Sequence, residues 1–252
     1  MIDTNANLSR WPCRRLAGDD PADFVARMRK AGVTQAWVAS FDGLLHRDVG
    51  GVNARLAADC KEHGAGLLIP FGTVNPKLPD WQEDLRRCHE VYRMPGIRLH
   101  PNYHGYTLAD PVFAEVLRRA TGAGMIVQLA TQMEDERTQY PLMRIPRVNL
   151  APLPEIVAGV PSLRLVVLNA PRDPLRQKIA AAGDVYFDIA MVEGVGGVGV
   201  LASELSPKRV VFGSHFPLFY LQSAALKIKE AGFSAADEKT ILEDNARRLL
   251  HS

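Results

Sequence analysis

The sequence predicts an α/β fold: a single (β/α)8 TIM barrel in one domain that spans residues 1–252. Short apolar segments recur about every 30 residues, which is the length of a strand, a helix and their two turns. Several segments are continuously apolar, as expected for strands with both faces covered. The first segment also lacks the glycine-rich turn of a doubly wound nucleotide-binding sheet, so we expect a closed barrel.

The strands of this barrel are taken from the apolar segments in chain order. We place them at residues 2–7, 33–39, 66–71, 96–100, 125–131, 163–169, 185–190 and 209–214. Helices follow where an aspartate precedes a proline, because the carboxylate caps free N–H groups and proline fits the first helical turn. These pairs are Asp20-Pro21, Asp110-Pro111 and Asp173-Pro174, and we expect Asp80 and Ser234 to cap two further helices.

Two stretches interrupt this regular pattern. Residues 132–149, after the fifth strand, contain no clear helix or strand signal, and long loops of this kind are often functional lids. Residues 193–203 are rich in glycine, so the helix there should be short or frayed.

Composition limits the classes of partner. Thirty Lys and Arg against 28 Asp and Glu leave a net charge of +2, without the basic excess of a nucleic-acid binder. We expect no membrane span and no export signal, since no apolar run is long enough and the first ten residues are not apolar. The three dispersed cysteines, Cys13, Cys60 and Cys88, suit a reducing cytoplasm. We therefore expect a cytoplasmic protein with a small-molecule ligand, and a homo-oligomer is left open.

Polar residues gather where the predicted strands end. Active sites of such barrels lie at the carboxyl ends of the strands, and alternation of side chains separates inward from outward positions. Apolar Ile97 and Leu99 should face the helices, which turns Arg98 and His100 inward. The other inward polar residues are Asp3, Asn5, Asn7, Gln128, Asn169, Asp188 and His215. Their convergence predicts the site.

Segments across nearly the whole chain resemble the amidohydrolase superfamily, in the amidohydrolase-related branch of metal-dependent hydrolases, decarboxylases and lactonases. The matching segments are IDTNANL, GIRLHPNYHGYTLADPVFAEVLRRATGAGMIVQL, PSLRLVVLNA, VYFDIA, RVVFGSHFPL and DNARRLL. The resemblance implies a TIM barrel with a site for a small carboxylated or carbonyl substrate at its mouth.

The metal ligands of that branch are replaced in this chain. The family pattern is His-x-His after strand one, a histidine on strands five and six, and an aspartate on strand eight. Asn5, Asn7, Ala130, Asn169 and His215 stand at those positions. Catalytic zinc needs three good protein ligands. We therefore expect a degenerate metal site and no cofactor, with a relocated divalent-metal site built from His100, His215 and an acid of 134–136 as the alternative.

His215 is the main catalytic candidate, because imidazole has an ordinary pKa near 6.5 and serves as a general base. Asn5, Asn7 and Asn169 are expected to donate hydrogen bonds to a developing oxyanion. The residues expected to contact the substrate are Arg98, His100, Gln128, Glu134 and Trp11. Arg98 would anchor a carboxylate if Asp3 or Asp188, its expected partners, left it partly free.

Two functions stay open at this stage. One is a hydrolase with lactonase- or decarboxylase-like activity that uses His215 as its base. The other is a non-catalytic pseudoenzyme that binds a small ligand or a protein partner.

Overall fold

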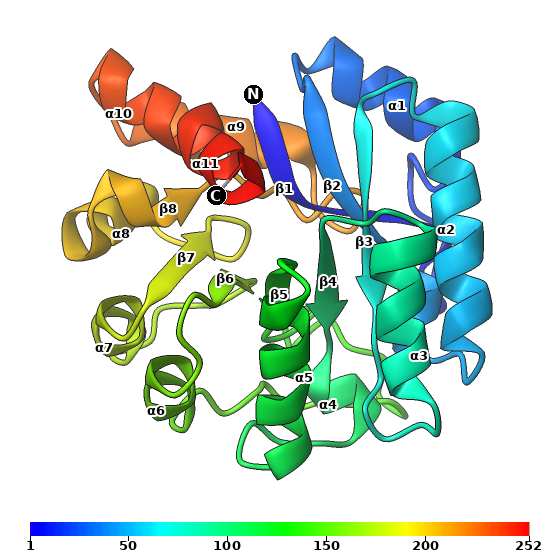
Figure 1. Cartoon of the computed structure of the whole chain (residues 1–252). Helices are drawn as coiled ribbons and strands as arrows, with labels where there is room; N and C mark the ends of the chain where they lie inside the picture. The colour runs from blue at the N-terminus through cyan, green and yellow to red at the C-terminus, as the bar shows by residue number, and fades with distance from the viewer. Residues whose placement is uncertain (252) are drawn as a thin grey trace.

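The computed structural model describes residues 1–251 and confirms the barrel. Eight parallel strands are hydrogen-bonded in chain order, each to the next, and helices surround them (Figure 1). The strands are β1 (Ile2–Leu8), β2 (Gln35–Ser40), β3 (Leu68–Thr73), β4 (Gly96–Leu99), β5 (Ile126–Ala130), β6 (Arg164–Leu168), β7 (Asp184–Asp188) and β8 (Val210–Val211).

Backbone hydrogen bonds between the last and the first strand close the barrel. The Thr4 N–H donates to the Phe212 carbonyl at 2.9 Å, and the His215 N–H donates to the Asn5 carbonyl at 2.7 Å. Asn7 and Phe216 extend this seam with a further bond of 2.9 Å. Closure therefore carries the seam past the end of β8 and fixes the backbone of His215 against that of β1.

The helices lie between the strands in the expected order. They are α1 (Pro21–Lys30), α2 (Val49–His63), α3 (Trp81–Arg86), α4 (Pro101–His104), α5 (Pro111–Gly122), α6 (Leu153–Ala158), α7 (Arg176–Ala181), α8 (Gly197–Leu205), α9 (Leu221–Glu230), α10 (Ala235–Lys239) and α11 (Asn245–His251). A π-helical turn extends α3 over 87–91, and another joins α10 to α11 over 240–244. Over the described residues, no helix combines the length and the apolar character that crossing a membrane requires.

Some predicted helix caps form and others do not. The Asp20 carboxylate accepts hydrogen bonds from two backbone N–H groups of α1, and the Ser234 hydroxyl accepts one from Asp237, as predicted. Asp80 makes no capping bond, because its backbone lies in the left-handed region at φ 59°. The prediction at Asp173 was also wrong in position, since its carboxylate caps a turn at Leu175 and α7 begins one residue later.

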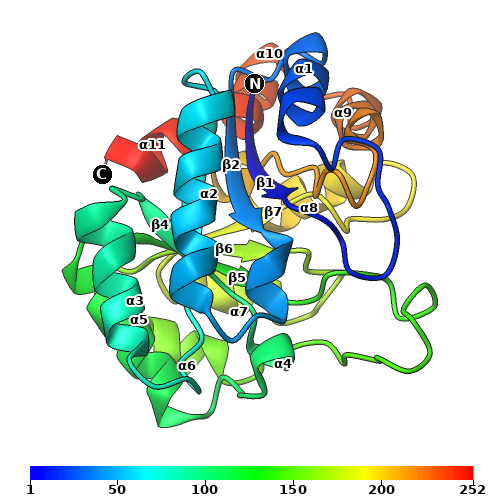
Figure 2. The same ribbon diagram turned by 90° about the vertical axis from the view of Figure 1, so that its right-hand side faces the viewer.

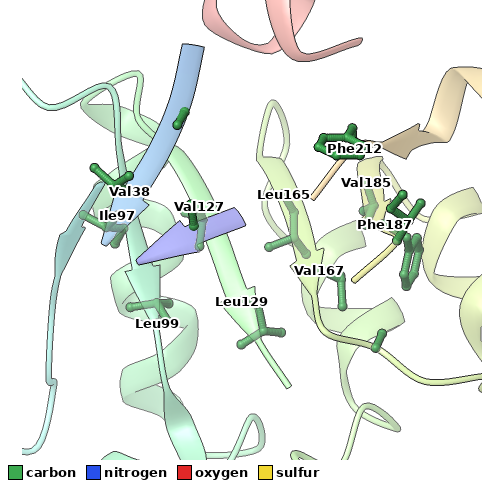
Figure 3. Packing of buried hydrophobic residues seen from close by; sticks show 14 of the residues in the cluster. Val38, Ile97, Leu99, Val127, Leu129, Leu165, Val167, Val185, Phe187 and Phe212 are labelled. Carbon is green, nitrogen blue, oxygen red and sulfur yellow. The ribbon is translucent and has the colours of Figure 1, made fainter. Parts of the chain in front are cut away.

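Side chains alternate between two apolar environments along the strands. Residues that face outward pack against the helices, among them Ile97, Leu99, Val127, Leu129, Val167 and Phe187 (Figure 3). Residues at the intervening positions fill the amino end of the barrel, where Trp37 and Phe71 stack at 4.9 Å between ring centres. Leu249 of α11 packs against this inner cluster. The amino end is therefore closed by apolar packing, which leaves the carboxyl end for a site.

The loops that follow β1 and β5 extend from the same side of the barrel (Figure 2). Between the end of β5 and the start of α6, residues 131–152 form neither helix nor strand, which agrees with the long loop predicted over 132–149. The helix predicted to be short after residue 193 begins at Gly197.

Candidate active site at the carboxyl end of the barrel

An amide network joins β1, β6 and β7 at the carboxyl end of the barrel. The Asn5 amide nitrogen donates to Asn169 Oδ1 at 2.7 Å and to Asp188 Oδ2 at 2.6 Å. Asp188 Oδ1 accepts a further bond from the backbone N–H of Asn169 at 2.8 Å. All three side chains are buried. Burial raises the pKa of Asp188 to about 6, although the bonds from Asn5 and Asn169 favour its ionised form.

His215 lies beside this network with a defined tautomer. Its Nε2 is 2.8 Å from the Met133 carbonyl oxygen, which can only accept, so Nε2 carries the proton. Its Nδ1 lies 3.4 Å from the Asn7 amide nitrogen and accepts. Full burial lowers the pKa of His215 to about 4, so the ring is neutral at pH 7.

The backbone is strained just after β6 and just after β8, where Asn169 and His215 lie. Asn169 and His215 both have φ 58°, a left-handed conformation that is uncommon outside glycine. Residues are held in such conformations where the surrounding structure determines them, often at functional sites. The chain therefore aims both side chains into the barrel mouth through locally strained turns.

Arg98 lies within the barrel and binds neutral groups. Its Nε donates to Gln128 Oε1 at 2.8 Å, and its Nη1 donates to Asn7 Oδ1 at 2.9 Å and to the Ala6 carbonyl at 3.0 Å. The expected ion pair with Asp3 or Asp188 does not form, and both carboxylates act on Arg98 only at longer range. Because its donors are engaged by amides and carbonyls, Arg98 holds the side chains of Asn7 and Gln128 in place.

Asp3 belongs to the seam between β1 and β8. Its carboxylate accepts hydrogen bonds from the hydroxyl and the backbone N–H of Ser214 and from the backbone N–H of Asn5. Burial is the main cause that raises the pKa of Asp3 to about 6, against the effect of these hydrogen bonds.

The loop after β5 covers the network directly. The Gln132 carbonyl accepts from the Asn169 amide nitrogen at 2.8 Å, and the next carbonyl, of Met133, accepts from His215. The Met133 side chain packs in a small apolar cluster with Trp11, Phe41, Leu44, Ala130 and Leu218. Two consecutive carbonyls and an apolar cover thus separate the amide network from solvent.

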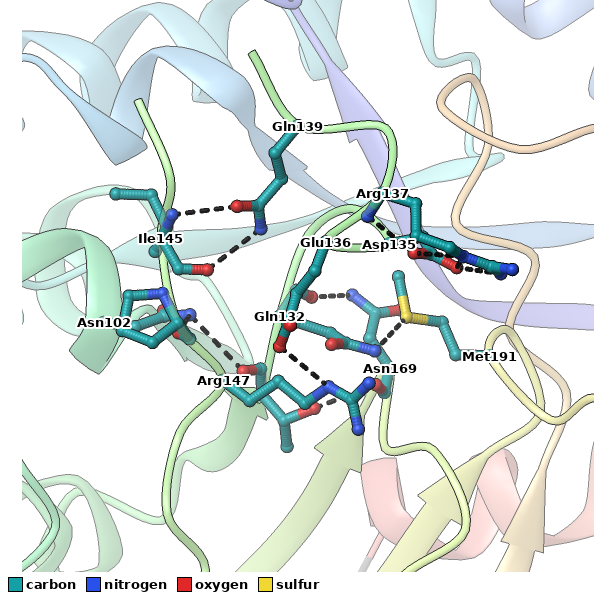
Figure 4. Close-up of polar contacts among 12 residues, drawn as sticks. Asn102, Gln132, Asp135, Glu136, Arg137, Gln139, Ile145, Arg147, Asn169 and Met191 are labelled. Carbon is teal, nitrogen blue, oxygen red and sulfur yellow. Dashed lines mark hydrogen bonds and ion pairs between the residues drawn. The ribbon is translucent and has the colours of Figure 1, made fainter. Parts of the chain in front are cut away.

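Further contacts hold this loop in place. Glu134 is almost fully buried and accepts from Arg14 Nη1 at 2.6 Å. Gln139 bridges both backbone groups of Ile145, and Asn102 donates to the Pro146 carbonyl at 2.9 Å (Figure 4). Among the charged residues 134–137, Glu134 therefore forms a buried ion pair, and the others form exposed ion pairs.

Two predicted contact residues have nitrogen atoms without a partner. Neither ring nitrogen of His100, nor the indole nitrogen of Trp11, has a hydrogen-bond acceptor or donor within the described chain. His100 lies 6.0 Å from His104 between ring centres, and burial lowers its pKa well below the ordinary value. The side-chain amide oxygen of Asn5, Oδ1, has no hydrogen-bond partner in the described chain either. The mouth therefore keeps polar atoms that a small polar ligand could satisfy.

An open cavity of about 640 Å³ lies beside the covered network. Its wall includes Gln132, Met191, Phe219 and Lys227, from the loops after β5, β7 and β8 and from α9. The Lys227 ammonium donates to the Ala190 carbonyl at 2.8 Å, and its partial burial lowers its pKa. Gln132 lines the cavity and also covers Asn169, so this cavity adjoins the network.

Comparison with known proteins identifies the lineage of this barrel. Residues 3–251 match the family model described as amidohydrolase. The chain belongs to the amidohydrolase family. No curated protein matches it.

Solved structures with the same fold are found among decarboxylases. This amidohydrolase is similar to 5-carboxyvanillate decarboxylase from Novosphingobium aromaticivorans, at 14% identity and a TM-score of 0.77, over 100% of this chain and 97% of that one. It is also similar to 2,6-dihydroxybenzoate decarboxylase from Rhizobium, at 12% identity and 0.73, over 99% of each chain. A third is the dihydroxybenzoic acid decarboxylase of Polaromonas sp. JS666, at 13% identity and 0.69, over 99% and 97% of the two chains.

These structures correct the expectation that no cofactor is used. The Novosphingobium and Polaromonas enzymes were both crystallised with manganese, so a divalent metal accompanies this fold in its neighbours. The side chains of this amidohydrolase do not fit that ion as they are arranged here. Within residues 1–251, no three His, Cys, Asp or Glu side chains lie together as a ligand group, and Asp188 is engaged by Asn5 and Asn169. The alternative metal site, expected from His100, His215 and an acid of 134–136, does not form either, since Glu134 binds Arg14 and His215 binds Met133.

The groups that enclose the site were not predicted from the sequence. Backbone carbonyls of Gln132 and Met133 carry no residue-type signal, so nothing in the sequence indicated them as partners of Asn169 and His215. Lys227 was missed because it lies on α9, away from the strand ends. Its position within an amphipathic helix, on the edge of the apolar face, was the one available signal.

Proposed function

We propose that this amidohydrolase is a decarboxylase-like enzyme that acts on a small carboxylated compound at the carboxyl end of the barrel. The names of the neighbouring structures support decarboxylation rather than hydrolysis, which the sequence had left open. A carboxylated aromatic acid is the substrate class, since 2,6-dihydroxybenzoate is the ligand of one neighbour.

One observation supports this proposal above the others. His215 Nε2 and Asn169 Nδ2 are convergent N–H donors, and consecutive loop carbonyls accept from them at 2.8 Å each. A carboxylate presents two acceptor oxygens and would bind charge-assisted to the same donors. The loop therefore occupies the position that a carboxylated ligand would take once residues 132–134 lift away.

The remaining residues supply a proton and positioning. In decarboxylation the bond from the substrate carbon to its carboxyl group breaks, its electron pair stays on that carbon, and CO2 leaves. A proton must then reach the carbon. We assign this proton to Asp188, because its raised pKa of about 6 keeps part of the population protonated near neutral pH. Asn5 positions Asp188, and Arg98 positions Asn7, through the bonds described above.

The test measures CO2 release from 2,6-dihydroxybenzoate and 5-carboxyvanillate, with and without added manganese. His215→Asn is the diagnostic variant, since asparagine tolerates the left-handed backbone at this position. His46→Asn, at an exposed histidine, is the matched control. We expect turnover in the parent and the control, and a loss of at least about tenfold in His215→Asn. Equal rates in the two variants would remove His215 from the mechanism.

Complete burial of the network favours a second function, a non-catalytic ligand-binding protein. Asn5, Asn169 and His215 have no solvent exposure, and the cavity of 640 Å³ stays open beside them. In this case a benzoate would bind in the cavity without any CO2 release. Saturable binding by calorimetry with no turnover, at any manganese concentration, would establish this alternative.

A further inference from the structure

A second cavity, of about 420 Å³, lies between the loop after β1 and the segment that joins β8 to α9. Its wall is formed by residues 14–17, by Arg27 of α1, and by residues 216–218 and 220–222. This volume is in the range of small-molecule sites. The side chains of the amide network do not line it, so this cavity is separate from the candidate active site.

Three arginines line this cavity. They are Arg14, Arg15 and Arg27, and no Asp or Glu stands among the described residues of the wall. The remaining wall residues are apolar or neutral. Positive charges that surround one concave space add their potentials, and the low-dielectric wall focuses the field. The cavity is therefore favourable for an anion.

The acidic partners of two of these arginines are buried outside the wall. Arg14 pairs with Glu134 and Arg15 pairs with Asp19, each at 2.6 Å. The arginine side chains are 45% and 69% exposed, whereas those of Glu134 and Asp19 are only 4% and 6% exposed. Each arginine is thus the accessible member of its pair, and the buried carboxylate holds the guanidinium beside the cavity.

Each of the three guanidinium groups keeps N–H donors for a ligand. Within residues 1–251, Arg14 donates only through Nη1, and Arg27 only through Nε, to Asp23 at 2.8 Å. Arg15 uses Nε and Nη2 for Asp19, which leaves its Nη1. A guanidinium has five N–H donors, so all three arginines retain donors that match the oxygen atoms of phosphate or carboxylate.

We propose that this cavity binds a small molecule with two or more adjacent oxyanion groups, held by Arg14, Arg15 and Arg27. Three guanidinium groups around one space carry more charge than a single oxyanion neutralises, which favours a polyanion. A diphosphate and a polycarboxylate share this chemistry. The site goes beyond the proposed decarboxylation and does not depend on it, because its wall contains none of the residues assigned to that reaction.

The test titrates the intact protein with pyrophosphate, and separately with citrate, by calorimetry at constant ionic strength. NMR of the arginine Nε–H groups locates the site. We expect saturable binding of at least one of the two anions, with shifts at Arg15 and Arg27. Tighter binding of pyrophosphate indicates a phosphorylated ligand, and tighter binding of citrate indicates a polycarboxylate. If neither anion binds saturably, or if the shifts are confined to other arginines, the proposal is wrong.

Two variants of α1 with the same change of charge complete the test. Arg27→Gln should weaken binding of the anion at least about tenfold, whereas Arg29→Gln, at an exposed arginine outside the wall, should leave it unchanged. Arg27 pairs only with the exposed Asp23, so its loss should not prevent folding. Equal affinities in the two variants would contradict the role of Arg27.

Discussion

The two ends of the barrel interior are built by the same alternation of side chains but are filled differently. At the amino end, Trp37, Phe71 and their neighbours form an apolar cluster, and the Trp37 indole nitrogen donates to Gln35 Oε1 at 3.2 Å. At the carboxyl end, Asn5, Asn169 and Asp188 are buried just as deeply and are joined by hydrogen bonds, although Asn5 Oδ1 has no partner in the described chain. Burial of polar groups costs free energy unless they are paired, so the carboxyl end is stabilised only as a complete network. Changes there should therefore alter proton affinities as well as stability.

The largest effect is expected from Arg98→Ala. The change leaves the neutral acceptors Gln128 Oε1 and Asn7 Oδ1 without their buried donor, at about 1–3 kcal/mol each, so the free energy of unfolding should fall by about 2–6 kcal/mol. The pKa of His215 should rise, because the charge of Arg98 helps to lower it. Urea unfolding and NMR titration of the ring measure the two effects.

Trp37→Ala is the matched change at the amino end. It should cost a similar amount, about 3–5 kcal/mol, through the cavity it leaves. The pKa of His215 should stay the same, since Trp37 packs in the apolar inner cluster. A shift of equal size in both variants would mean that the two ends are not separable.

The pH dependence of stability should change in His215→Asn. The pKa of His215 is about 4 in the folded chain and about 6.5 when unfolded, so the folded state binds fewer protons between these values. The stabilisation from the neutral ring is complete above pH 6.5 and is lost as the pH falls through 4, by about 3 kcal/mol. The variant should lack this component.

Asp3 and Asp188 act in the opposite direction, because their pKa values are raised to about 6 and they favour the folded state at low pH. The comparison must therefore be the difference between parent and variant, measured by urea unfolding at pH 4.5 and pH 7. A constant difference across this range would contradict the burial of a neutral His215.

A smaller loss of stability is expected from Asn5→Ala, about 1–3 kcal/mol, because Asp188 Oδ2 loses its donor inside the barrel. The pKa of Asp188 should rise further, since the bond from Asn5 lowers it. Carboxyl titration by NMR checks the direction. An unchanged pKa would show that Asn5 does not hold the carboxylate.

Much of the contrast between the apolar amino end and the polar carboxyl end of the barrel could be predicted from the sequence. Ile97 and Leu99 alternate with Arg98 and His100, and this pattern alone places the arginine inside the barrel. The strand ends and the long loop after β5 also follow from the apolar segments. Such features depend on residue type and spacing, which a sequence displays directly.

The partners of these residues could not be predicted. Arg98 binds amides rather than Asp3 or Asp188 because the bulge in β1 and the seam with Ser214 direct Asp3 elsewhere. His215 is held by the Met133 carbonyl, and a backbone acceptor has no signature in the sequence.

The smallest effect on global stability should come from Arg14→Ala, which tests whether the cover over the carboxyl end opens separately from the barrel. Arg14 is 45% exposed and its partner Glu134 only 4%, so the released carboxylate should become hydrated by local opening of the loop, which limits the global cost to about 1 kcal/mol or less. The loop, however, loses the contact next to Met133. Trypsin should then cleave at Arg137, Arg144 or Arg147 several times faster than in the parent, because local opening exposes loop backbone.

Arg86→Ala is the control for that experiment, since it removes exposed pairs with Glu83 and Glu90 on α3, far from the loop in sequence. Cleavage within 132–149 should not accelerate in this variant. If both variants are cut at the rate of the parent, the apolar packing of Met133 with Trp11 and Leu218 holds the cover without help from the ion pair. Faster cleavage in Arg14→Ala alone would show that the carboxyl end, unlike the amino end, opens without unfolding the barrel, as entry of a carboxylate to His215 and Asn169 requires.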